Sequence, residues 1–439
     1  MEIADRSASP PSSKSLIVLA STLGTTIEWY DFFLYGVLTP IVLNRLFFPS
    51  MSPVMGTIAA YTTFAVGFLS RPIGGIIFGH YGDRLGRKTI LVLTMLIMGG
   101  STFLIGALPT TDSIGIAAPL LLLLLRILQG IGIGGEWGGA VLMTIEHAPP
   151  GKRSLYGSWP QLGVPLGLMS SAGVVAVLNL FPDTAFIAWG WRAAFFVSAA
   201  LVAIGLYVRL KIMETPDFEK ARLENKIVPV PITELFRNYK REVLLTLGAR
   251  YVEGACFNTF GVFIIYYVTH SLGLTRGLAL NTVIISSAIM LPFIIVAGIL
   301  ADRFGLRRVF AWGTIMIAIL TALSFWTMDR FGAQHPGIVM IAVILPFSLA
   351  YPMVYGTESS LFASQFDANV RYTGVSFAYQ FSGIFASGLT PLIATALINA
   401  GGGKSGLVVL YMVIVAGISL ISVLLMKGIS ANLRRAALA

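Results

Sequence analysis

Twelve mostly apolar segments follow one another along this 439-residue chain, and each is long enough to cross a membrane. A helix needs about 20 such residues to span the hydrocarbon layer. The sequence therefore predicts an all-α membrane protein of twelve transmembrane helices. We place the spans near residues 16–44, 54–79, 89–108, 116–146, 155–180, 189–209, 243–269, 278–300, 309–328, 337–364, 372–399 and 406–426.

Composition supports a lipid-exposed surface. Only 11% of the residues are charged and 56% are hydrophobic, whereas soluble proteins carry roughly 25% charged residues. The first span contains Glu28 and Asp31, which a cleaved signal peptide would lack, so we expect it to remain in the mature protein. Cys256 is the single cysteine, so no intramolecular disulfide can form, and a thiolate metal site is not expected.

Positive charge is distributed unevenly between the two sides of the predicted membrane. The termini and the loops after spans 2, 4, 6, 8 and 10 carry 22 of the 30 Lys and Arg residues. The opposite side carries five, namely Arg45, Arg192, Arg276, Arg330 and Lys404. The positive-inside rule predicts that both termini are cytoplasmic. The net charge of +10 then faces anionic lipid headgroups, and we expect no nucleic-acid partner.

The longest polar stretch separates two groups of six spans. It covers residues 210–242 and contains Pro229 and Pro231. We interpret it as a cytoplasmic linker between two six-helix halves. The predicted organisation is a tail at 1–14, a first half at 15–209, the linker at 210–242, a second half at 243–427 and a tail at 428–439.

An internal repeat supports these halves. GHYGDRLGRK at 79–88 and GILADRFGLRR at 298–308 place Asp83 and Asp302 219 residues apart. The same shift relates Gln161 to Gln380, and a shift of 218 relates Arg153 to Arg371. One offset at three places indicates a duplicated six-helix unit. Such halves usually enclose a site near the midplane and move by rocking about it.

Several motifs together resemble one family of transporters. They are the GHYGDRLGRK stretch with its weaker second copy, IEWYDFFLYG at 27–36, RPIGG at 71–75 and RILQGIGIGGEWGG at 126–139. The chain resembles the major facilitator superfamily, and within it the metabolite:proton symporters, closest to the shikimate branch. This resemblance implies a bacterial inner-membrane symporter that carries a small organic anion with a proton. The chain ends soon after the last span, at Ala439, without the long C-terminal coiled-coil extension of some osmosensing betaine carriers.

Charges inside the membrane are costly unless paired or hydrated, so each is a candidate functional group. At about 1.5 Å per residue, Asp31 lies about 22 Å from one surface and Arg126 about 15 Å from the other. We therefore predict an ion pair between Asp31 and Arg126, an arrangement that the resemblance also implies. The full set of intramembrane charges is Glu28, Asp31, Arg71, Arg126, Glu136, Arg250, Glu253 and Glu358.

This pair suggests a coupling mechanism. Protonation of Asp31 would release Arg126, whose planar donors suit a carboxylate. The alternative is a static pair that only fixes helix packing. Glu28 shares a helix face with Asp31 and is either a second proton site or a hydrogen-bonding neighbour.

Two of the remaining charges, Glu136 and Arg250, each have two possible roles. Glu136 either latches the inward gate or pairs with a nearby cation. Arg250 is a second candidate for binding the substrate carboxylate, or pairs locally with Glu253 three residues later. We assign Arg71 a structural role near the Asp83 loop, and the sequence identifies no partner for Glu358.

A cytoplasmic latch is implied by the resemblance. In the superfamily the 79–88 loop stabilises the outward-open state, and Gly86 permits its tight turn. The alternative is simple topological anchoring by the basic residues. The connection between spans 4 and 5, from Glu146 to Arg153, resembles another cytoplasmic charge-relay element. In the second copy Ser364 replaces the acid while Arg371 remains, which weakens the expectation of a relay there. The candidate latch residues are Asp83, Arg84, Arg87, Lys88, Glu136, Glu146, Arg153, Asp302, Arg303 and Arg371.

Uncharged polar and aromatic residues are candidates for the cavity wall. A hydroxy acid needs hydrogen-bond partners, although polar residues also join helices to one another in membranes. The candidates beside Arg126 and Arg250 are Tyr30, Tyr35, Gln129, Trp137, Gln161, Tyr379 and Gln380.

Enzymatic function is not expected. The Gly130–Gly135 run fits a dinucleotide pattern, but it lies inside a span, where small residues favour close helix packing. The four histidines are scattered, and the sequence contains no nucleophile motif and no ATP-binding loop, so we expect no metal or cofactor. Three transport functions remain: a proton symporter for a carboxylated metabolite, a proline or betaine symporter, and an uncoupled exchanger or facilitator of organic anions. We expect a monomer.

Overall fold

The computed structural model describes residues 14–85, 87–134, 151–211, 232–367 and 370–426, together with Val141, Thr144, Ile145 and Ala148. These residues form helices joined by short turns, and no strand occurs among them. Nine helices of this part are long and apolar enough to cross a membrane, and two shorter apolar helices, Val92–Ala107 and Ala117–Ile133, accompany them. With α1, they account for the twelve predicted spans.

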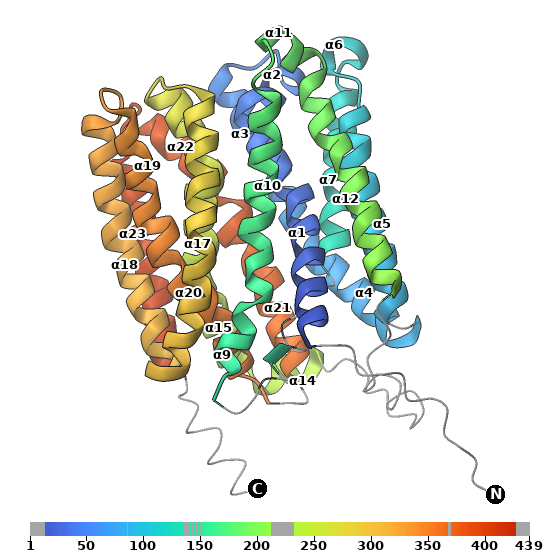
Figure 1. Ribbon diagram of the computed structural model, residues 1–439, viewed down its shortest axis with the longest axis vertical. Helices are drawn as coiled ribbons and strands as arrows, with labels where there is room; N and C mark the ends of the chain where they lie inside the picture. The colour runs from blue at the N-terminus through green and yellow to red at the C-terminus, as the bar shows by residue number, and fades with distance from the viewer. Residues whose placement is uncertain are drawn as a thin grey trace, which may run out of the picture.

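The helices of the first half occupy one side of the molecule (Figure 1). In chain order they are α1 (Lys14–Leu38), η1 (Thr39–Leu43), α2 (Asn44–Phe47), α3 (Pro53–Leu69), α4 (Arg71–Leu85), α5 (Arg87–Ala107), α6 (Thr111–Ile114), α7 (Ala117–Ile133), α9 (Arg153–Ser158), η2 (Pro160–Leu162), α10 (Gly163–Leu178), α11 (Asp183–Ala185), η3 (Phe186–Gly190) and α12 (Trp191–Lys211).

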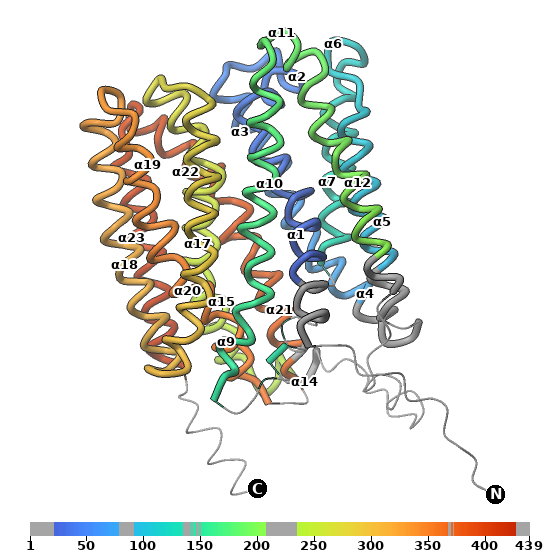
Figure 2. Tube along the Cα trace, in the orientation of Figure 1, coloured from blue at the N-terminus to red at the C-terminus, as the bar shows by residue number. Residues whose placement is uncertain are grey.

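The helices of the second half occupy the other side, and the same division can be followed along the chain trace in Figure 2. They are α14 (Ile232–Asn238), α15 (Lys240–Asn258), η4 (Thr259–Phe263), α16 (Ile264–Tyr266), η5 (Tyr267–Ser271), α17 (Arg276–Phe304), α18 (Leu306–Thr327), η6 (Met328–Gly332), α19 (Pro336–Ile344), η7 (Leu345–Ala350), α20 (Tyr351–Ala363), α21 (Arg371–Gly383), η8 (Ile384–Gly388), α22 (Thr390–Ala400) and α23 (Gly406–Leu425).

Two seams join the halves. Helices α9 and α10 pack against α17, and α3 packs against η8 and α22. Within the first half α1 packs on α10 and α12, and within the second α15 packs on α21 and α23. We call the two ends of the bundle the α9 end, where α9, α14 and α21 lie, and the α11 end, where α2, α6 and α11 lie (Figure 1).

The outer surface is apolar, as a lipid-facing surface should be. Large side chains on α5, α18 and α23 are exposed, among them Leu104, Ile319 and Ile421. A surface this rich in exposed aliphatic groups would be unstable in water. The described charged side chains that were predicted inside the membrane lie instead between the helices, where they are buried.

The signature loops are shorter than the sequence indicated. Helix α4 continues to Leu85 and α5 begins at Arg87, so most of the predicted 79–88 loop is helical. In the second copy α17 ends at Phe304 and α18 begins at Leu306. Gly305 alone makes that turn, with φ of 95°, a conformation that glycine adopts without steric cost. In this second copy, Gly305 therefore forms the turn between α17 and α18.

Candidate functional site

Arg126 lies fully buried on α7 among aromatic rings. Its guanidinium carbon is 4.5 Å from the ring centroid of Phe32 and 4.4 Å from that of Tyr35. Its Nη1 donates a hydrogen bond to the side-chain oxygen of Gln129, and Nη2 donates to the backbone oxygen of Phe64 at 3.5 Å. Cation–π contacts are strongest where water is excluded, so the rings stabilise a guanidinium that has no carboxylate beside it in the described part of the chain.

Asp31 is completely buried on α1, one turn before Tyr35. Among the residues that the structure describes, neither carboxylate oxygen has a hydrogen-bond partner of acceptable geometry. The nearest polar side chains are the hydroxyls of Ser198 on α12 and Thr102 on α5. A buried acid in this position is a strong candidate for a group that binds a proton.

The predicted ion pair between Asp31 and Arg126 is wrong for this conformation. Asp31 faces α5 and α12, whereas Arg126 lies against Phe32 and Tyr35 on another face of α1. The depths estimated from the sequence placed the two residues at a similar level in the membrane, but such an estimate does not determine the direction in which either side chain points.

Gln129 connects the surroundings of the two groups. Its side-chain oxygen accepts from Arg126, and its nitrogen donates to the backbone oxygen of Asp31 at 3.1 Å and to Thr102 Oγ1 at 2.7 Å. One amide therefore contacts both the guanidinium and the hydroxyl beside the carboxylate. Sequence spacing could have indicated this, because Gln129 is three residues after Arg126 and so lies on the same helix face.

Arg71 is more central than its sequence position suggested. We expected a structural role near the Asp83 loop, but its guanidinium lies 4.2 Å from the Phe32 ring centroid and 4.1 Å from that of Phe68. Its Nε and Nη2 atoms are buried without hydrogen-bond partners. Glu28 lies within electrostatic range of this guanidinium. Arg71 and Arg126 thus share the Phe32 ring, on which both cations depend.

A second buried charge cluster lies in the other half. Arg250 on α15 is 3.5 Å from Glu253 and 3.3 Å from Glu358 on α20. The local Arg250–Glu253 pair is confirmed, and Glu358, for which the sequence identified no partner, also contacts Arg250. The guanidinium carbon lies 3.7 Å from the ring centroid of Tyr379. Arg250 is thereby already paired with carboxylates, whereas no described carboxylate pairs with Arg126.

Glycines bring α7 close to the second span, which α3 and α4 form. A Cβ atom on Gly130 would lie 2.0 Å from the backbone oxygen of Gly67, and one on Gly134 would lie 2.0 Å from that of Arg71. The glycine-rich run therefore serves helix packing, as the sequence indicated. Gly67 also faces the Arg126 guanidinium, since its Cβ would be 2.8 Å from Nη2.

Most of the predicted wall residues make hydrogen bonds between helices. Tyr30 donates to the backbone oxygen of Ala194 at 2.9 Å, and the Tyr35 hydroxyl contacts Thr63. Gln161 donates to the backbone oxygen of Tyr355 at 3.1 Å, and Gln380 to that of Gly134 at 3.0 Å. The two glutamines thus join the halves in this conformation. Trp137, Glu136 and Glu146 lie outside the described residues.

The halves also meet at the α9 end. Asp302 accepts hydrogen bonds from the backbone nitrogens of Ser154 at 2.9 Å and Leu155 at 3.0 Å. The Arg153 backbone oxygen accepts from Ser360, and Arg371 donates to the backbone oxygen of Phe366, while Arg303 lies over the Phe304 ring. The side chains of Asp83, Arg84, Arg87 and Lys88 lie outside the described part.

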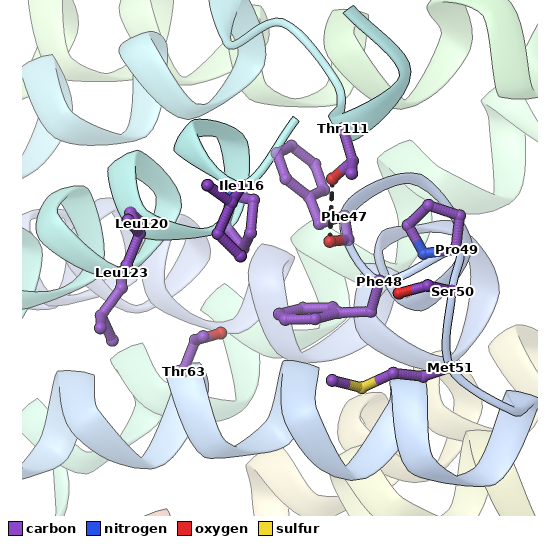
Figure 3. Close-up of a pocket in the computed structure, with 11 residues that line it drawn as sticks. Phe47, Phe48, Pro49, Ser50, Met51, Thr63, Thr111, Ile116, Leu120 and Leu123 are labelled. Atoms are coloured by element: carbon purple, nitrogen blue, oxygen red, sulfur yellow. Dashed lines mark hydrogen bonds between the residues drawn. The ribbon is translucent and has the colours of Figure 1, made fainter. Parts of the chain in front are cut away.

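The α11 end is closed as well. Arg276 of the second half and Asp183 of the first form an ion pair of 2.7 Å, beside a cavity of about 490 Å³ that Arg45 and His270 also line. Another cavity of about 450 Å³ lies at this end, within the first half (Figure 3). Its wall is largely apolar, and Arg126 and Asp31 are not part of it. We therefore do not regard it as the transport site.

Sequence reasoning missed the partners that come from distant helices. Ser198, Thr102, Tyr351 and Ser382 each contact one of the buried charges, but all are common residue types in membrane helices. The sequence carries no signal for their positions.

Residues 21–388 match the Major Facilitator Superfamily. The chain belongs to this superfamily. Inner membrane metabolite transport protein YhjE of Escherichia coli is 40% identical over 428 residues, which cover 95% of this chain and 94% of that protein. The shikimate transporter of the same organism is 40% identical over 412 residues and 93% of each chain.

The superfamily assignment agrees with the architecture. A D-xylose–proton symporter has the same fold, with a TM-score of 0.72 at 18% identity over 93% of this chain and 96% of that one. The proline/betaine transporter of Escherichia coli is 34% identical over 425 residues, covering 93% of this chain and 83% of that protein. The chain is therefore a multi-pass membrane transporter and not an enzyme, and the predicted relationship to metabolite symporters is confirmed.

Proposed function

We propose that this protein carries a small carboxylated metabolite into the cell together with a proton, by alternating access across the bacterial inner membrane. The observation that carries the proposal is the presence of a buried cation and a buried acid, both fully enclosed, on neighbouring spans of the first half. Arg126 has no carboxylate partner among the described residues, and both oxygens of Asp31 lack hydrogen bonds. The first is suited to bind an anion and the second to bind a proton.

Arg126 is suited to hold the substrate carboxylate. Its guanidinium presents planar donors that match a carboxylate, and its Nε is buried without a hydrogen-bond partner. Arg71 adds a second guanidinium against the same Phe32 ring. Two cations in a closed site strongly favour an anionic ligand. A hydroxylated monocarboxylate such as shikimate, or a keto acid with two carboxylates, fits this charge.

Asp31 is suited to bind the coupling proton. Protonation removes a negative charge that would otherwise be buried without a counter-ion, which is costly in the membrane interior. We propose that an ionised Asp31 pairs with Arg126 in another step of the cycle, so that protonation frees Arg126 for substrate. The separation of the two groups in this closed conformation fits the freed state. Gln129, which contacts the Arg126 guanidinium and the backbone oxygen of Asp31, would move with the exchange.

Alternating access is supported by the contacts at both ends. Asp302 closes the α9 end, which charge distribution predicts to be cytoplasmic, and the Asp183–Arg276 pair closes the α11 end. Opening either end while the other stays closed would expose the central charges to one side at a time. The 15–209 and 243–427 halves would be the moving bodies.

A zwitterionic osmolyte is the second candidate. Trp29 stacks on Phe33 with centroids 5.0 Å apart, and Phe257 of the other half lies 5.1 Å from Phe33. Such rings can surround a quaternary ammonium group, and the proline/betaine relative is 34% identical. We favour the organic acid because two guanidinium groups, those of Arg71 and Arg126, lie against one ring, and the relatives named for metabolites are more similar.

Substrate-induced proton uptake tests the proposal. Cells that overproduce the protein are suspended in weak buffer, and external pH is followed after addition of shikimate, α-ketoglutarate, citrate, proline or glycine betaine. Alkalinisation with one organic acid, abolished by Asp31→Asn and kept by the control Asp112→Asn on exposed helix α6, is the expected result. Labelled uptake of an acid without any pH change would refute proton coupling, and a response to betaine alone would support the second candidate.

A further inference from the structure

The second charge cluster has no role in the mechanism described so far. It contains Arg250, Glu253 and Glu358, with exposed fractions of 2%, 4% and 0%. Arg250 and Glu253 come from α15, and Glu358 comes from α20. Three ionisable side chains from two spans are thus buried together, away from Asp31.

The contacts within the cluster are direct. Arg250 Nε lies 3.3 Å from Glu358 Oε1, and Arg250 Nη2 lies 3.5 Å from Glu253 Oε2. Tyr351 donates to the other oxygen of Glu253 at 2.7 Å, and Arg250 Nη1 donates to Ser382 at 3.3 Å. Glu358 receives no hydrogen bond of acceptable geometry on either oxygen. One guanidinium therefore lies near two carboxylates, and among the described residues only Glu253 of the two also accepts a hydrogen bond.

The charges of the cluster do not balance. Two ionised carboxylates and one guanidinium leave one negative charge in a site that water does not reach. The other titratable groups facing it are Tyr351, Tyr355, Tyr379 and Cys256, which are ordinarily neutral. Arg71 of the first half is within electrostatic range, but aromatic rings hold it. Two acids that share one cation in a buried site do not both remain ionised.

We propose that the Arg250–Glu253–Glu358 cluster binds one exchangeable proton, shared between its two carboxylates, and is a second proton site of this transporter. Protonation of either carboxyl leaves one ionised carboxylate for Arg250 and removes the excess charge. Arg250 lies near both carboxylates, and Glu253 is better stabilised as the ionised form, because Tyr351 donates a hydrogen bond to it. The proton therefore resides mainly on Glu358.

The cluster lies where rocking of the halves would open it. A Cβ atom on Gly383 would lie 3.5 Å from Arg250 Nη1 and 3.6 Å from the Phe68 ring of the first half. Phe68 thus covers the cluster from across the interface. When the halves separate, this cover moves away and the carboxyl can exchange its proton with water. A role for this proton in transport rests on the proposed function, whereas its binding does not.

Infrared difference spectroscopy tests the binding directly. The purified protein in lipid is compared between acidic and alkaline buffer, and the carbonyl stretch of a protonated carboxylic acid is followed. An Asp31→Asn background removes the contribution of Asp31. We expect this variant to keep one such band that disappears at alkaline pH. Adding Glu358→Gln should abolish the band, whereas adding Glu242→Gln, an acid at the start of the same α15, should not.

A second variant, Glu253→Gln, distinguishes loss of the proton site from misfolding. Glu253→Gln, like Glu358→Gln, leaves one carboxylate for Arg250, so each should fold with a normal unfolding temperature and lack the band. Absence of a band in the Asp31→Asn background would overturn the proposal, as would its persistence in both glutamine variants. The infrared spectra need no substrate. The uptake assay can therefore refute the symport proposal without affecting the conclusion about proton binding to the cluster.

Discussion

The contact between Gly67 and Arg126 provides a sharp test of where the substrate carboxylate binds. In Gly67→Ala the new Cβ would lie 2.8 Å from Arg126 Nη2 and 3.2 Å from the guanidinium carbon, whereas ordinary contacts begin at 3.4 Å. The guanidinium must therefore retreat by about 0.6 Å. Because the obstructing atoms are the far end of a flexible side chain, the protein should still fold.

The expected effect is on binding. A hydrogen bond to a charged group contributes about 1.5–3 kcal/mol, so misplacing the guanidinium should weaken substrate binding roughly 10- to 100-fold. The change is measured by equilibrium binding of labelled substrate to the purified protein, with the unfolding temperature followed in parallel.

Gly173→Ala is the matched control. Gly173 lies within helix α10, and its Cβ would meet no atom within 4 Å. Alanine there should stabilise the helix slightly, by about 0.5–1 kcal/mol, without affecting binding. If Gly67→Ala folds and binds substrate as tightly as the unaltered protein, the assignment of Arg126 as the carboxylate site is refuted.

Three further changes follow from the described contacts. Asp302→Ala removes the acceptor for two backbone nitrogens across the α9 end. If this interaction stabilises the closed end by about 0.3–1 kcal/mol, the end should open two- to fivefold more often in the variant. The opening is measured by the labelling rate of a cysteine introduced at that end. Gln129→Leu should reduce proton-driven accumulation of substrate, because the link between Arg126 and Thr102 is lost. Exchange of labelled for unlabelled substrate should stay largely intact. An equal loss of accumulation and exchange would contradict this role of Gln129. Asp183→Asn should change the transport rate less than about fivefold, since exposed ion pairs contribute about 0–1 kcal/mol.

The sequence predicted the fold well because membrane helices leave a strong signal in hydrophobicity alone. The spans, the repeat offset and the packing role of Gly130 and Gly134 follow from local patterns that the bilayer imposes. The largest error in local structure was the 79–88 loop, which is mostly helix. Polar residues can continue a helix past the membrane surface, and hydropathy does not detect this.

The site was predictable in its residue types but not in its contacts. Buried charge in a span marks Asp31, Arg126, Arg250 and Glu358 as important, and this is visible without a structure. Which charge meets which depends on the rotation of each helix about its axis, which span boundaries do not determine. For this reason the Asp31–Arg126 pair was wrong for this conformation and the Arg250–Glu358 contact was not foreseen.

The central claim is that protonation of Asp31 makes Arg126 available to the substrate. The most direct measurement is the dissociation constant of the transported acid, identified in the uptake assay, over a range of pH for the unaltered protein and for Asp31→Asn. Binding to the unaltered protein should weaken as pH rises, by up to about tenfold per pH unit for each linked proton. In Asp31→Asn the dissociation constant should depend on pH less steeply, by about one linked proton, and binding should remain tight at alkaline pH. The same decline in both proteins would contradict the account.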